Sequence, residues 1–399
     1  MKQYPAKLAD ELAQELENIL KYWSLNCLDI ENDGFVGKRD HFNNQVKGAS
    51  KGVVLNSRIL WTFSAAYNFT RNAHYLVLAE RAYRYINKYF IDTQWGGLFW
   101  EVNDKGEVLS GRKQIYAQGF GIYAYSEYFK ASGVPQALES AISLFECIEK
   151  YSFDPIDGGY LEALARDWSM LQDFRLSTKD ANEPKSMNTH LHILESYTNL
   201  LRVWPNEGLR EKIRALIRIF LDKIIDPRTF HFNLFFDYRW TVRSSIVSFG
   251  HDIEGAWLLY EAAMVVQDKQ LIQEVSDNLV RMVDVTMAEG SAIDGSVYNE
   301  KDTHSGHLDD DKHWWMQAEA MVGLSYAWKI TGKDIYRNQL EKVWHFIKNS
   351  MIDRQNGEWF WRVDKDGIAI TTEDKAGFWK CPYHNSRAMM EIITILRQK

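Results

Sequence analysis

Six short turns that combine glycine or asparagine with aromatic residues recur along this chain, and this repetition constrains its fold more than any other feature. Their centres lie near Gly34, Gly96, Gly158, His231, Gly295 and Gly357. Neighbouring centres are 62 to 73 residues apart, and three of the five separations are 62. Asp-Gly, Gly-Gly and Asn-Gly pairs favour tight hairpins, because glycine adopts the positive φ that these turns require. The chain therefore consists of one unit repeated six times.

Between the turns, apolar residues recur with the period of an α-helix. Examples are the series Leu76, Ala79, Ala82, Tyr83 and Ile86, and the series Leu191, Leu194, Tyr197, Leu200 and Leu201. One unit accommodates two helices of roughly 15 to 20 residues, their loops and one small hairpin. Helix pairs that need neighbours to cover their apolar faces stack as a solenoid or close into a ring. We expect an all-α protein, an (α/α)6 barrel of about twelve helices with short β-hairpins between helix pairs.

Composition indicates one globular domain. The chain has 399 residues, of which 46% are hydrophobic and 25% charged, which is enough apolar material for a large core. Only seven prolines occur, and no Pro/Gly/Ser-rich linker divides the sequence. We expect a single catalytic barrel domain spanning residues 1–399.

Charge and cysteine usage exclude several classes of protein. A net charge of -7 argues against nucleic-acid binding, which needs a concentrated basic face. No run of 18 apolar residues predicts a membrane span, and residues 1–23 lack the apolar core of a signal peptide. Cys27, Cys147 and Cys381 are odd in number and far apart, which suggests reduced thiols. We expect a cytoplasmic protein, and a monomer in preference to an oligomer.

Each turn is followed, 20 to 30 residues later, by polar or aromatic side chains on an otherwise apolar helix. In order, they are Arg58, Tyr116, Asn188 with His192, His251 with Glu254 and Trp257, Trp314 and Trp315 with Glu319, and Trp379 with His384. The similar offsets place them on the same helix of each pair, which is the inner helix of a closed ring. Because burying charge and imidazole is costly, their convergence on one central site predicts a function.

His251 and Glu254 lie three residues apart, so on a helix they share one face, with Trp257 one step further. A carboxylate partner fixes the tautomer of an imidazole and raises its basicity. We expect Glu254 to orient His251 in a proton-transfer site beside an aromatic stacking surface. A structural histidine on a buried helix is the alternative interpretation of this stretch taken alone.

Other motifs carry less weight. Residues 119–124 match the G-x-G-x-x-A dinucleotide pattern, but no strand precedes them and they lie in a helical stretch. His304, His307 and His313 accompany acidic residues 309–311 without the helical spacing of metal ligands, so a solvated loop is expected and no metal.

Histidines, an arginine and carboxylates, without a nucleotide or metal motif, suit removal and return of a proton next to a carbonyl. Arg58 can stabilise an enediolate oxygen, since its charge persists at any working pH. Two imidazoles on opposite faces of one carbon would invert that centre. The abundant aromatic residues, 15 Trp, 20 Tyr and 20 Phe, fit a carbohydrate cleft, and fit a large helical core almost as well.

Four segments carry a resemblance to a known family: residues 188–192, 251–257, 314–319 and 379–385. They resemble the cellobiose 2-epimerases of the N-acylglucosamine 2-epimerase superfamily, and the resemblance covers essentially the whole chain. Trp379-Lys380-Cys381-Pro382-Tyr383-His384-Asn385 is its most specific part. The resemblance implies an (α/α)6 barrel that converts the reducing-end glucose of β-1,4-linked disaccharides to mannose with no added cofactor.

The resemblance also implies a role for each site residue. His251 and His384 match the paired acid/base residues, and Arg58 matches the arginine that stabilises the enediolate. Glu254 and Glu319 match carboxylates that support the histidines. His192 and Asn188 match residues that contact the sugar near the ring-opening step. The remaining matches are substrate-binding residues: Trp315 and Trp379, which hold the disaccharide, then Trp314, Trp257, Tyr116 and Asp180.

Three alternatives stay open at this stage. A mannose isomerase or a monosaccharide 2-epimerase like N-acylglucosamine 2-epimerase would use a similar arginine and histidine set. A glycoside hydrolase on the same barrel would need two carboxylates at a fixed separation, whereas the convergent groups here are mainly histidine and arginine. A non-catalytic sugar-binding protein would need the tryptophans but not the paired histidines.

Overall fold

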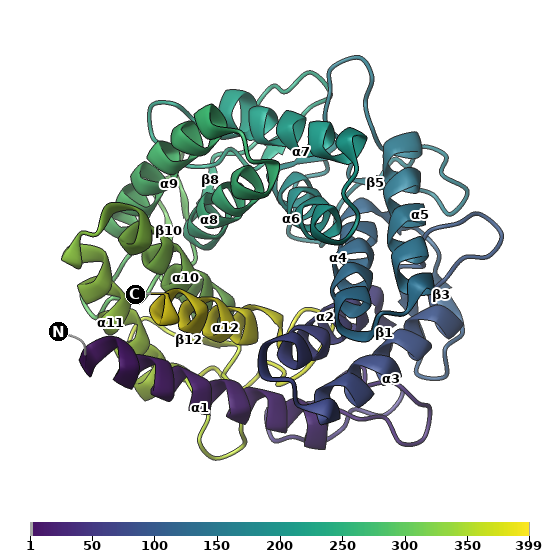
Figure 1. Ribbon diagram of the computed structural model, residues 1–399, viewed down its shortest axis with the longest axis horizontal. Helices are drawn as coiled ribbons and strands as arrows, with labels where there is room; N and C mark the ends of the chain where they lie inside the picture. The colour runs from purple at the N-terminus through teal and green to yellow at the C-terminus, as the bar shows by residue number, and fades with distance from the viewer. Residues whose placement is uncertain (1–2, 399) are drawn as a thin grey trace.

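The computed structural model describes residues 3–398, in which twelve α-helices form two concentric rings (Figure 1). The inner ring consists of α2 (Val53–Thr70), α4 (Ile115–Ser132), α6 (Met187–Val203), α8 (Phe249–Val266), α10 (Trp314–Thr331) and α12 (Tyr383–Arg397). The outer ring consists of α1 (Gln3–Asn26), α3 (Ala73–Tyr89), α5 (Pro135–Tyr151), α7 (Glu207–Ile219), α9 (Lys269–Glu289) and α11 (Asp334–Phe346). Short π-helices, η1 (Phe220–Ile224) and η2 (Ile347–Met351), extend α7 and α11. The predicted (α/α)6 barrel is confirmed.

Sequence pattern separates the two rings. Outer helices bury one stripe, as α7 does with Leu209, Ile213 and Leu216. Inner helices are buried nearly all round, because neighbours and the outer ring cover every face. Close packing in α8 requires a glycine, since a Cβ at Gly255 would lie 2.2 Å from the ring of Phe232. The ring closes where α12 packs against both α1 and α2.

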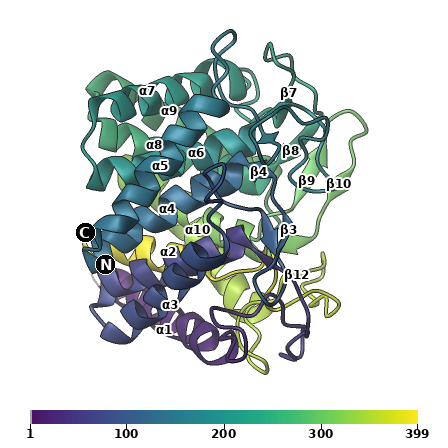
Figure 2. The same cartoon turned by 90° about the vertical axis from the view of Figure 1, so that its right-hand side faces the viewer.

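Short antiparallel strands connect one repeat to the next. The sheets are β1 (Lys51–Gly52) with β2 (Glu101–Val102) and β3 (Val108–Ser110); β4 (Lys113–Gln114) with β5 (Ala163–Leu164); β6 (Lys185–Ser186) with β7 (Phe235–Phe236); β8 (Ile246–Ser248) with β9 (Glu300–Asp302) and β10 (Leu308–Asp309); and β11 (Lys312–His313) with β12 (Arg362–Val363). A strand that enters an inner helix pairs with a strand from the following repeat. Figure 2 shows the strands gathered at one end of the barrel, which is the end where the inner helices begin.

Polar side chains on four inner helices clamp the turn of the preceding repeat. Each accepts a hydrogen bond from the backbone N–H of the residue that follows the turn. The pairs are Gln118 with Leu98 (2.7 Å), His190 with Tyr160 (2.9 Å), Asp252 with Phe232 (2.7 Å) and Gln317 with Val297 (2.8 Å). Some polar residues of the inner helices are therefore structural, a distinction that the sequence pattern did not reveal.

Buried lysines reinforce the same turns. Lys51, Lys113 and Lys185 each lie just before an inner helix, and each pairs with the aspartate that starts the turn, Asp29, Asp92 or Asp154. The N–O distances are 2.7, 3.0 and 2.7 Å. Because both charges are paired out of water, loss of either partner leaves an uncompensated buried ion.

In the part of the chain that the structure describes, no helix is long and apolar enough to cross a membrane.

Candidate active site

The first turns of the inner helices bring the predicted polar residues into one cluster. Arg58 Nη2 donates a hydrogen bond of 2.6 Å to the hydroxyl of Tyr116, whose ring lies 4.8 Å from that of His192. Across the barrel, the ring of Trp315 lies 4.8 Å from His251 and 5.6 Å from His384. Side chains from positions 58 to 384 thus meet at one end of the barrel axis.

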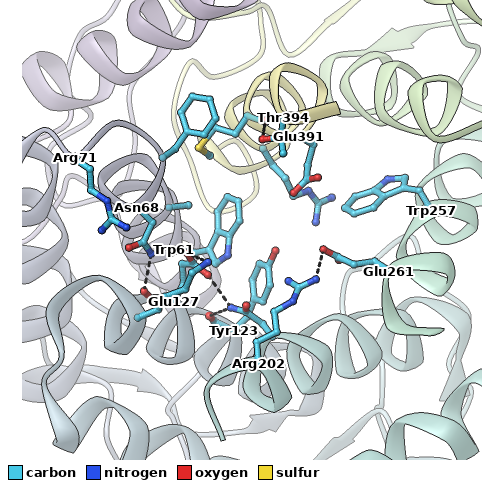
Figure 3. Close-up of a pocket in the computed structure, with 16 residues that line it drawn as sticks. Trp61, Asn68, Arg71, Tyr123, Glu127, Arg202, Trp257, Glu261, Glu391 and Thr394 are labelled. Atoms are coloured by element: carbon cyan, nitrogen blue, oxygen red, sulfur yellow. Dashed lines mark hydrogen bonds and ion pairs between the residues drawn. The ribbon is translucent and has the colours of Figure 1, made fainter. Parts of the chain in front are cut away.

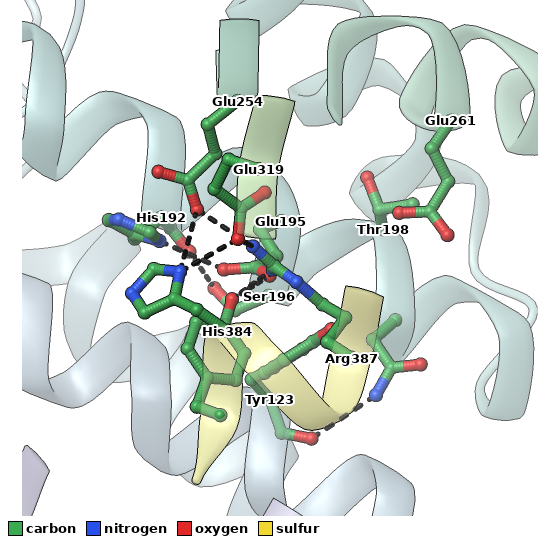
Figure 4. Close-up of polar contacts among 12 residues, drawn as sticks. Tyr123, His192, Glu195, Ser196, Thr198, Glu254, Glu261, Glu319, His384 and Arg387 are labelled. Carbon is green, nitrogen blue, oxygen red and sulfur yellow. Dashed lines mark hydrogen bonds and ion pairs between the residues drawn. The ribbon is translucent and has the colours of Figure 1, made fainter. Parts of the chain in front are cut away.

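At the centre of this cluster lies Arg387, which the sequence analysis missed. Figure 4 shows its guanidinium pointing into a group of three carboxylates, Glu195, Glu254 and Glu319. Nη2 lies 2.8 Å from Glu254 Oε1 and 2.7 Å from Glu319 Oε1, while Nη1 contacts Glu195 Oε1. All four side chains are buried. The available signal was an arginine in the apolar run of α12, one helical turn after His384.

Two histidines rest on these carboxylates. His192 Nδ1 lies 2.8 Å from Glu195 Oε2, and His384 Nδ1 lies 2.7 Å from Glu319 Oε1. A carboxylate at Nδ1 fixes the tautomer, so that Nε2 is the nitrogen left for a substrate. Burial and the charge of Arg58 hold the pKa of His384 well below its usual range. Burial raises the pKa of Glu195, but Arg387 and His192 outweigh it and lower the pKa to about 2.

The environment of His251 differs from the prediction. Its Nδ1 lies 2.8 Å from Ser248 Oγ, and Glu254 turns instead to Arg387. Although positions three apart share a helix face, the buried guanidinium attracts the carboxylate more strongly than a neutral imidazole does. Burial lowers the pKa of His251 to about 3, with a smaller contribution from His192. His251 is therefore a neutral imidazole without a carboxylate partner among residues 3–398.

Trp257 is not the predicted stacking surface. Only 1% of its area is exposed, its ring covers Arg387 at 4.7 Å, and its Nε1 donates to Glu319 Oε2 at 2.9 Å. Trp314 is also buried, against Trp361 and the ammonium of Lys380. Both tryptophans therefore pack against charged residues and are buried, so neither offers a ring face to a substrate.

Partly exposed aromatic rings lie at the entrance instead. Trp315 borders the two histidines, and Trp379 lies 6.0 Å from the rings of Tyr116 and Trp100. Trp100 was not among the predicted residues, since it follows the second turn directly and does not belong to an inner helix. Asn188, on the first turn of α6, has a buried Oδ1 that lacks a hydrogen-bond partner among the described residues.

Asp180 lies in the long loop between β5 and β6, where its carboxylate accepts a hydrogen bond of 2.7 Å from the backbone N–H of Ser177. Burial raises its pKa. Its described hydrogen bonds remain within this loop, so the structure does not join Asp180 to the histidines by a direct contact.

Arg58 is a buried cation without a carboxylate partner among the described residues. Besides Tyr116, it contacts Cys381 Sγ at 3.7 Å and lies over the rings of Phe120 (4.3 Å) and Tyr383 (4.9 Å). Soft and aromatic neighbours leave its charge largely uncompensated. The guanidinium is thus suited to bind an anionic oxygen.

A metal at this centre would compete with Arg387. Glu254, Glu319 and His384 offer ligand atoms within 4.8 Å of one another. The guanidinium already donates to both carboxylates, however, and supplies the positive charge that a metal ion would bring. Elsewhere, His304 and His307 are exposed at the turn between β9 and β10, and His313 precedes α10.

Comparisons with known proteins agree with this geometry. The family profile of N-acylglucosamine 2-epimerase (GlcNAc 2-epimerase) matches residues 34–388. The chain is 46% identical over 387 residues to a cellobiose 2-epimerase of Bacteroides fragilis, covering 97% of this chain and 98% of that protein. It is 22% identical over 406 residues to a D-mannose isomerase of Marinomonas mediterranea, covering 96% and 97%. The solved cellobiose 2-epimerase from Bacillus thermoamylovorans superposes with a TM-score of 0.92 and 37% identity, covering 98% and 99%.

Proposed function

Because this chain belongs to the N-acylglucosamine 2-epimerase family, we propose that it inverts C2 of the reducing-end glucose of β-1,4-linked disaccharides. Cellobiose becomes glucosyl-mannose, and lactose becomes epilactose. The observation that carries this proposal is the full-length similarity to cellobiose 2-epimerase of Bacteroides fragilis, at 46% identity. Since the cluster draws on residues from 58 to 387, the proposal treats residues 1–399 as one catalytic domain.

The reaction starts with opening of the reducing-end sugar ring, which exposes the aldehyde that acidifies the proton at C2. A neutral imidazole takes this proton and leaves a cis-enediolate. Arg58 stabilises the negative oxygen, because its buried charge has no carboxylate partner within residues 3–398 and its Nε–H, unpaired there, needs an acceptor. Rotation about C2–C3 then presents the other face of the carbon, and reprotonation there gives the mannose configuration.

His384 and His251 divide the proton transfers in this scheme. Both flank Trp315, and both have low pKa values, so they start as neutral bases. Glu319 at Nδ1 stabilises the imidazolium that forms when His384 Nε2 takes a proton. His251 Nδ1 contacts the hydroxyl of Ser248 and no carboxylate in the part of the chain that the structure describes, so its imidazolium returns a proton more readily.

Substrate positioning falls to the partly exposed groups. Trp315 and Trp379 offer apolar faces to the sugar rings. The unpaired Oδ1 of Asn188 and the Nε2 of His192, whose Nδ1–H donates to Glu195, are both placed to accept hydrogen bonds from sugar hydroxyls during ring opening. These roles follow from partial exposure and unpaired atoms.

Hydrolysis fits the site less well. A glycoside hydrolase needs one carboxylic acid and one carboxylate that face the scissile bond. Here Glu195, Glu254 and Glu319 all bind the same guanidinium, so their oxygens are committed to Arg387 and to the histidines. Imidazoles are the groups left to transfer protons.

Incubation of the purified protein with cellobiose, followed by chromatographic separation of the sugars, tests the function. We expect glucosyl-mannose to accumulate and reach an equilibrium with cellobiose. Parallel incubations with mannose and N-acetylmannosamine serve as controls for the monosaccharide enzymes. Conversion of either monosaccharide without conversion of cellobiose, or release of free glucose, would refute the proposal.

A further inference from the structure

A cavity lies on the barrel axis, at the end opposite the histidines. It has a volume of about 240 Å³ and is lined by the C-terminal halves of inner helices (Figure 3). Trp61, Tyr123, Arg202 and Glu391 approach it from α2, α4, α6 and α12. Arg387 separates it from the active site, because its Nη atoms hold the three carboxylates while the side chain also lines this cavity. The cavity is thus distinct from the proposed site of reaction.

Two buried donors in the cavity wall have no hydrogen-bond partner in the described part of the chain. Trp61 Nε1 and Arg387 Nε make no hydrogen bond within the described residues, although their side chains are only 6% and 1% exposed. An N–H group removed from water without an acceptor is destabilising, because it loses its hydrogen bond to water and gains none. An acceptor bound in the cavity would satisfy both donors.

Glu391 presents the opposite need. The hydroxyl of Tyr326 donates to its Oε2 at 3.1 Å, but no ion pair with a cation is found for it in the described chain. Burial and the nearby Glu261 raise its pKa to about 7. Four other charged groups of the lining form ion pairs, Arg202 with Glu261 at 2.7 Å and Lys130 with Glu127 at 3.3 Å. Glu391 is left as an acceptor, or a donor when protonated, that faces the cavity.

Hydroxyl groups satisfy both requirements at once, since each can accept from an N–H and donate to a carboxylate. Aromatic rings supply part of the wall: Trp61 stacks on Tyr123 at 5.1 Å, and Trp257 also lines the cavity. A full charge of either sign would meet a like charge, because Arg387 and Glu391 both border the cavity. The volume is also below the roughly 300 Å³ at which pockets for drug-sized ligands begin.

We propose that this cavity binds a neutral polyhydroxylated molecule of monosaccharide size, independently of the proposed reaction. Trp61 Nε1 and Arg387 Nε donate to its hydroxyl oxygens, Glu391 accepts from one hydroxyl, and the aromatic side chains of the wall pack against its C–H groups.

Saturation-transfer NMR with myo-inositol tests this proposal, since this cyclic polyol has no carbonyl and cannot be epimerised. The unmodified protein is titrated with and without saturating cellobiose. We expect saturation transfer to myo-inositol that persists in the presence of cellobiose. Displacement by cellobiose would assign the signal to the active site, and absence of saturation transfer would also overturn the proposal.

Variants locate the ligand. Trp61→Phe removes the unpartnered N–H, and Glu391→Leu removes the carboxylate at similar volume. Each should raise the dissociation constant of myo-inositol about five- to tenfold, as expected for loss of one hydrogen bond. Glu139→Gln, at an exposed position of α5, is the matched control and should leave it unchanged. Unchanged binding in both cavity variants would contradict the assignment, and epimerisation of cellobiose, measured separately, tests the other proposal.

Discussion

Two buried arginines of the central cluster have opposite surroundings. Arg58 has a phenol, a thiol and two aromatic rings beside it, whereas Arg387 binds three carboxylates. The first therefore keeps its charge for a substrate oxygen. The charge of Arg387 is neutralised by the three carboxylates, which it orients. Two of these carboxylates in turn fix His192 and His384. Arg58 is thus suited to a role in the reaction, whereas Arg387 stabilises the structure of the site.

Replacement of Arg58 should reduce catalysis with little effect on folding. Arg58→Met removes the charge that stabilises the enediolate, so kcat/KM for cellobiose should fall about 100- to 1,000-fold. Arg58→Lys keeps a positive charge but loses the planar guanidinium. Its kcat/KM should therefore lie between those of the unmodified protein and Arg58→Met. Steady-state epimerisation rates measure this loss, with thermal unfolding as the control. Full activity in Arg58→Met would rule out the proposed role.

Replacement of Arg387 should lower the free energy of unfolding. In Arg387→Met three buried carboxylates lose their shared cation, which should cost about 3–5 kcal/mol of unfolding free energy. Urea denaturation measures this value. Arg387→Lys restores the charge and should recover part of the stability. Equal urea midpoints for the unmodified protein and Arg387→Met would show that the carboxylates do not depend on this guanidinium.

At the scale of the helices, four inner helices (α4, α6, α8 and α10) have two tasks. One face clamps a turn of the preceding repeat, and the adjacent face carries the site. His190 and His192 illustrate this on α6: His190 binds the backbone of Tyr160, and His192 binds Glu195. Both look alike in the sequence, since each is a histidine in an apolar helix. Periodicity could thus predict the inner helix, but not which of its polar residues face the axis.

The clamp by His190 predicts a pH effect on stability. Its Nδ1–H donates to Ser186 and its Nε2 accepts from Tyr160, so only the neutral imidazole fits, and burial lowers the pKa to about 4. Between pH 6.5 and 4 the unfolded chain binds the extra proton, so stability falls as pH falls. His190→Gln keeps an acceptor, like Gln118 and Gln317 in other repeats.

Unfolding free energies at pH 7 and pH 5 test this effect. The unmodified protein should lose about 2 kcal/mol more than His190→Gln over this interval. Other titrating groups are shared by both proteins and cancel in the comparison. The same loss in both proteins would show that His190 does not titrate as its surroundings imply.

At the scale of the whole molecule, the ring depends on the contacts that join its two ends. Glu358, in the sixth turn, accepts from Trp23 of α1 at 2.6 Å, from Lys380 at 2.8 Å and from Asn385 of α12 at 2.7 Å. Trp359 adds a bond of 2.7 Å from its Nε1 to Glu15. First and last helices are thereby tied through one turn.

Loss of Glu358 should open this closure. Glu358→Ala leaves the fully buried Lys380 without its carboxylate, which should cost about 3–5 kcal/mol of unfolding free energy. Differential scanning calorimetry measures the decrease in Tm, and Glu139→Ala on the outer surface is the control. If both variants melt at the same temperature, Glu358 does not hold the ring closed.

Sequence reasoning predicted the barrel because six evenly spaced turns leave few alternatives, and it predicted convergence because inner helices face one axis. It assigned Glu254 to His251 wrongly, since helix spacing cannot reveal that Arg387 competes for the carboxylate. It also assigned Trp257 to a stacking surface for the substrate, although the indole is buried and donates a hydrogen bond to Glu319. Partners that are distant in the chain decide these details.

Proton exchange at C2 tests the central claim most directly. Cellobiose is incubated with the protein in deuterated water, and the glucosyl-mannose formed is analysed by NMR. Abstraction and return of a proton by imidazoles that exchange with solvent predicts deuterium at C2 of the product. Glucosyl-mannose that forms without deuterium at C2 would contradict the account.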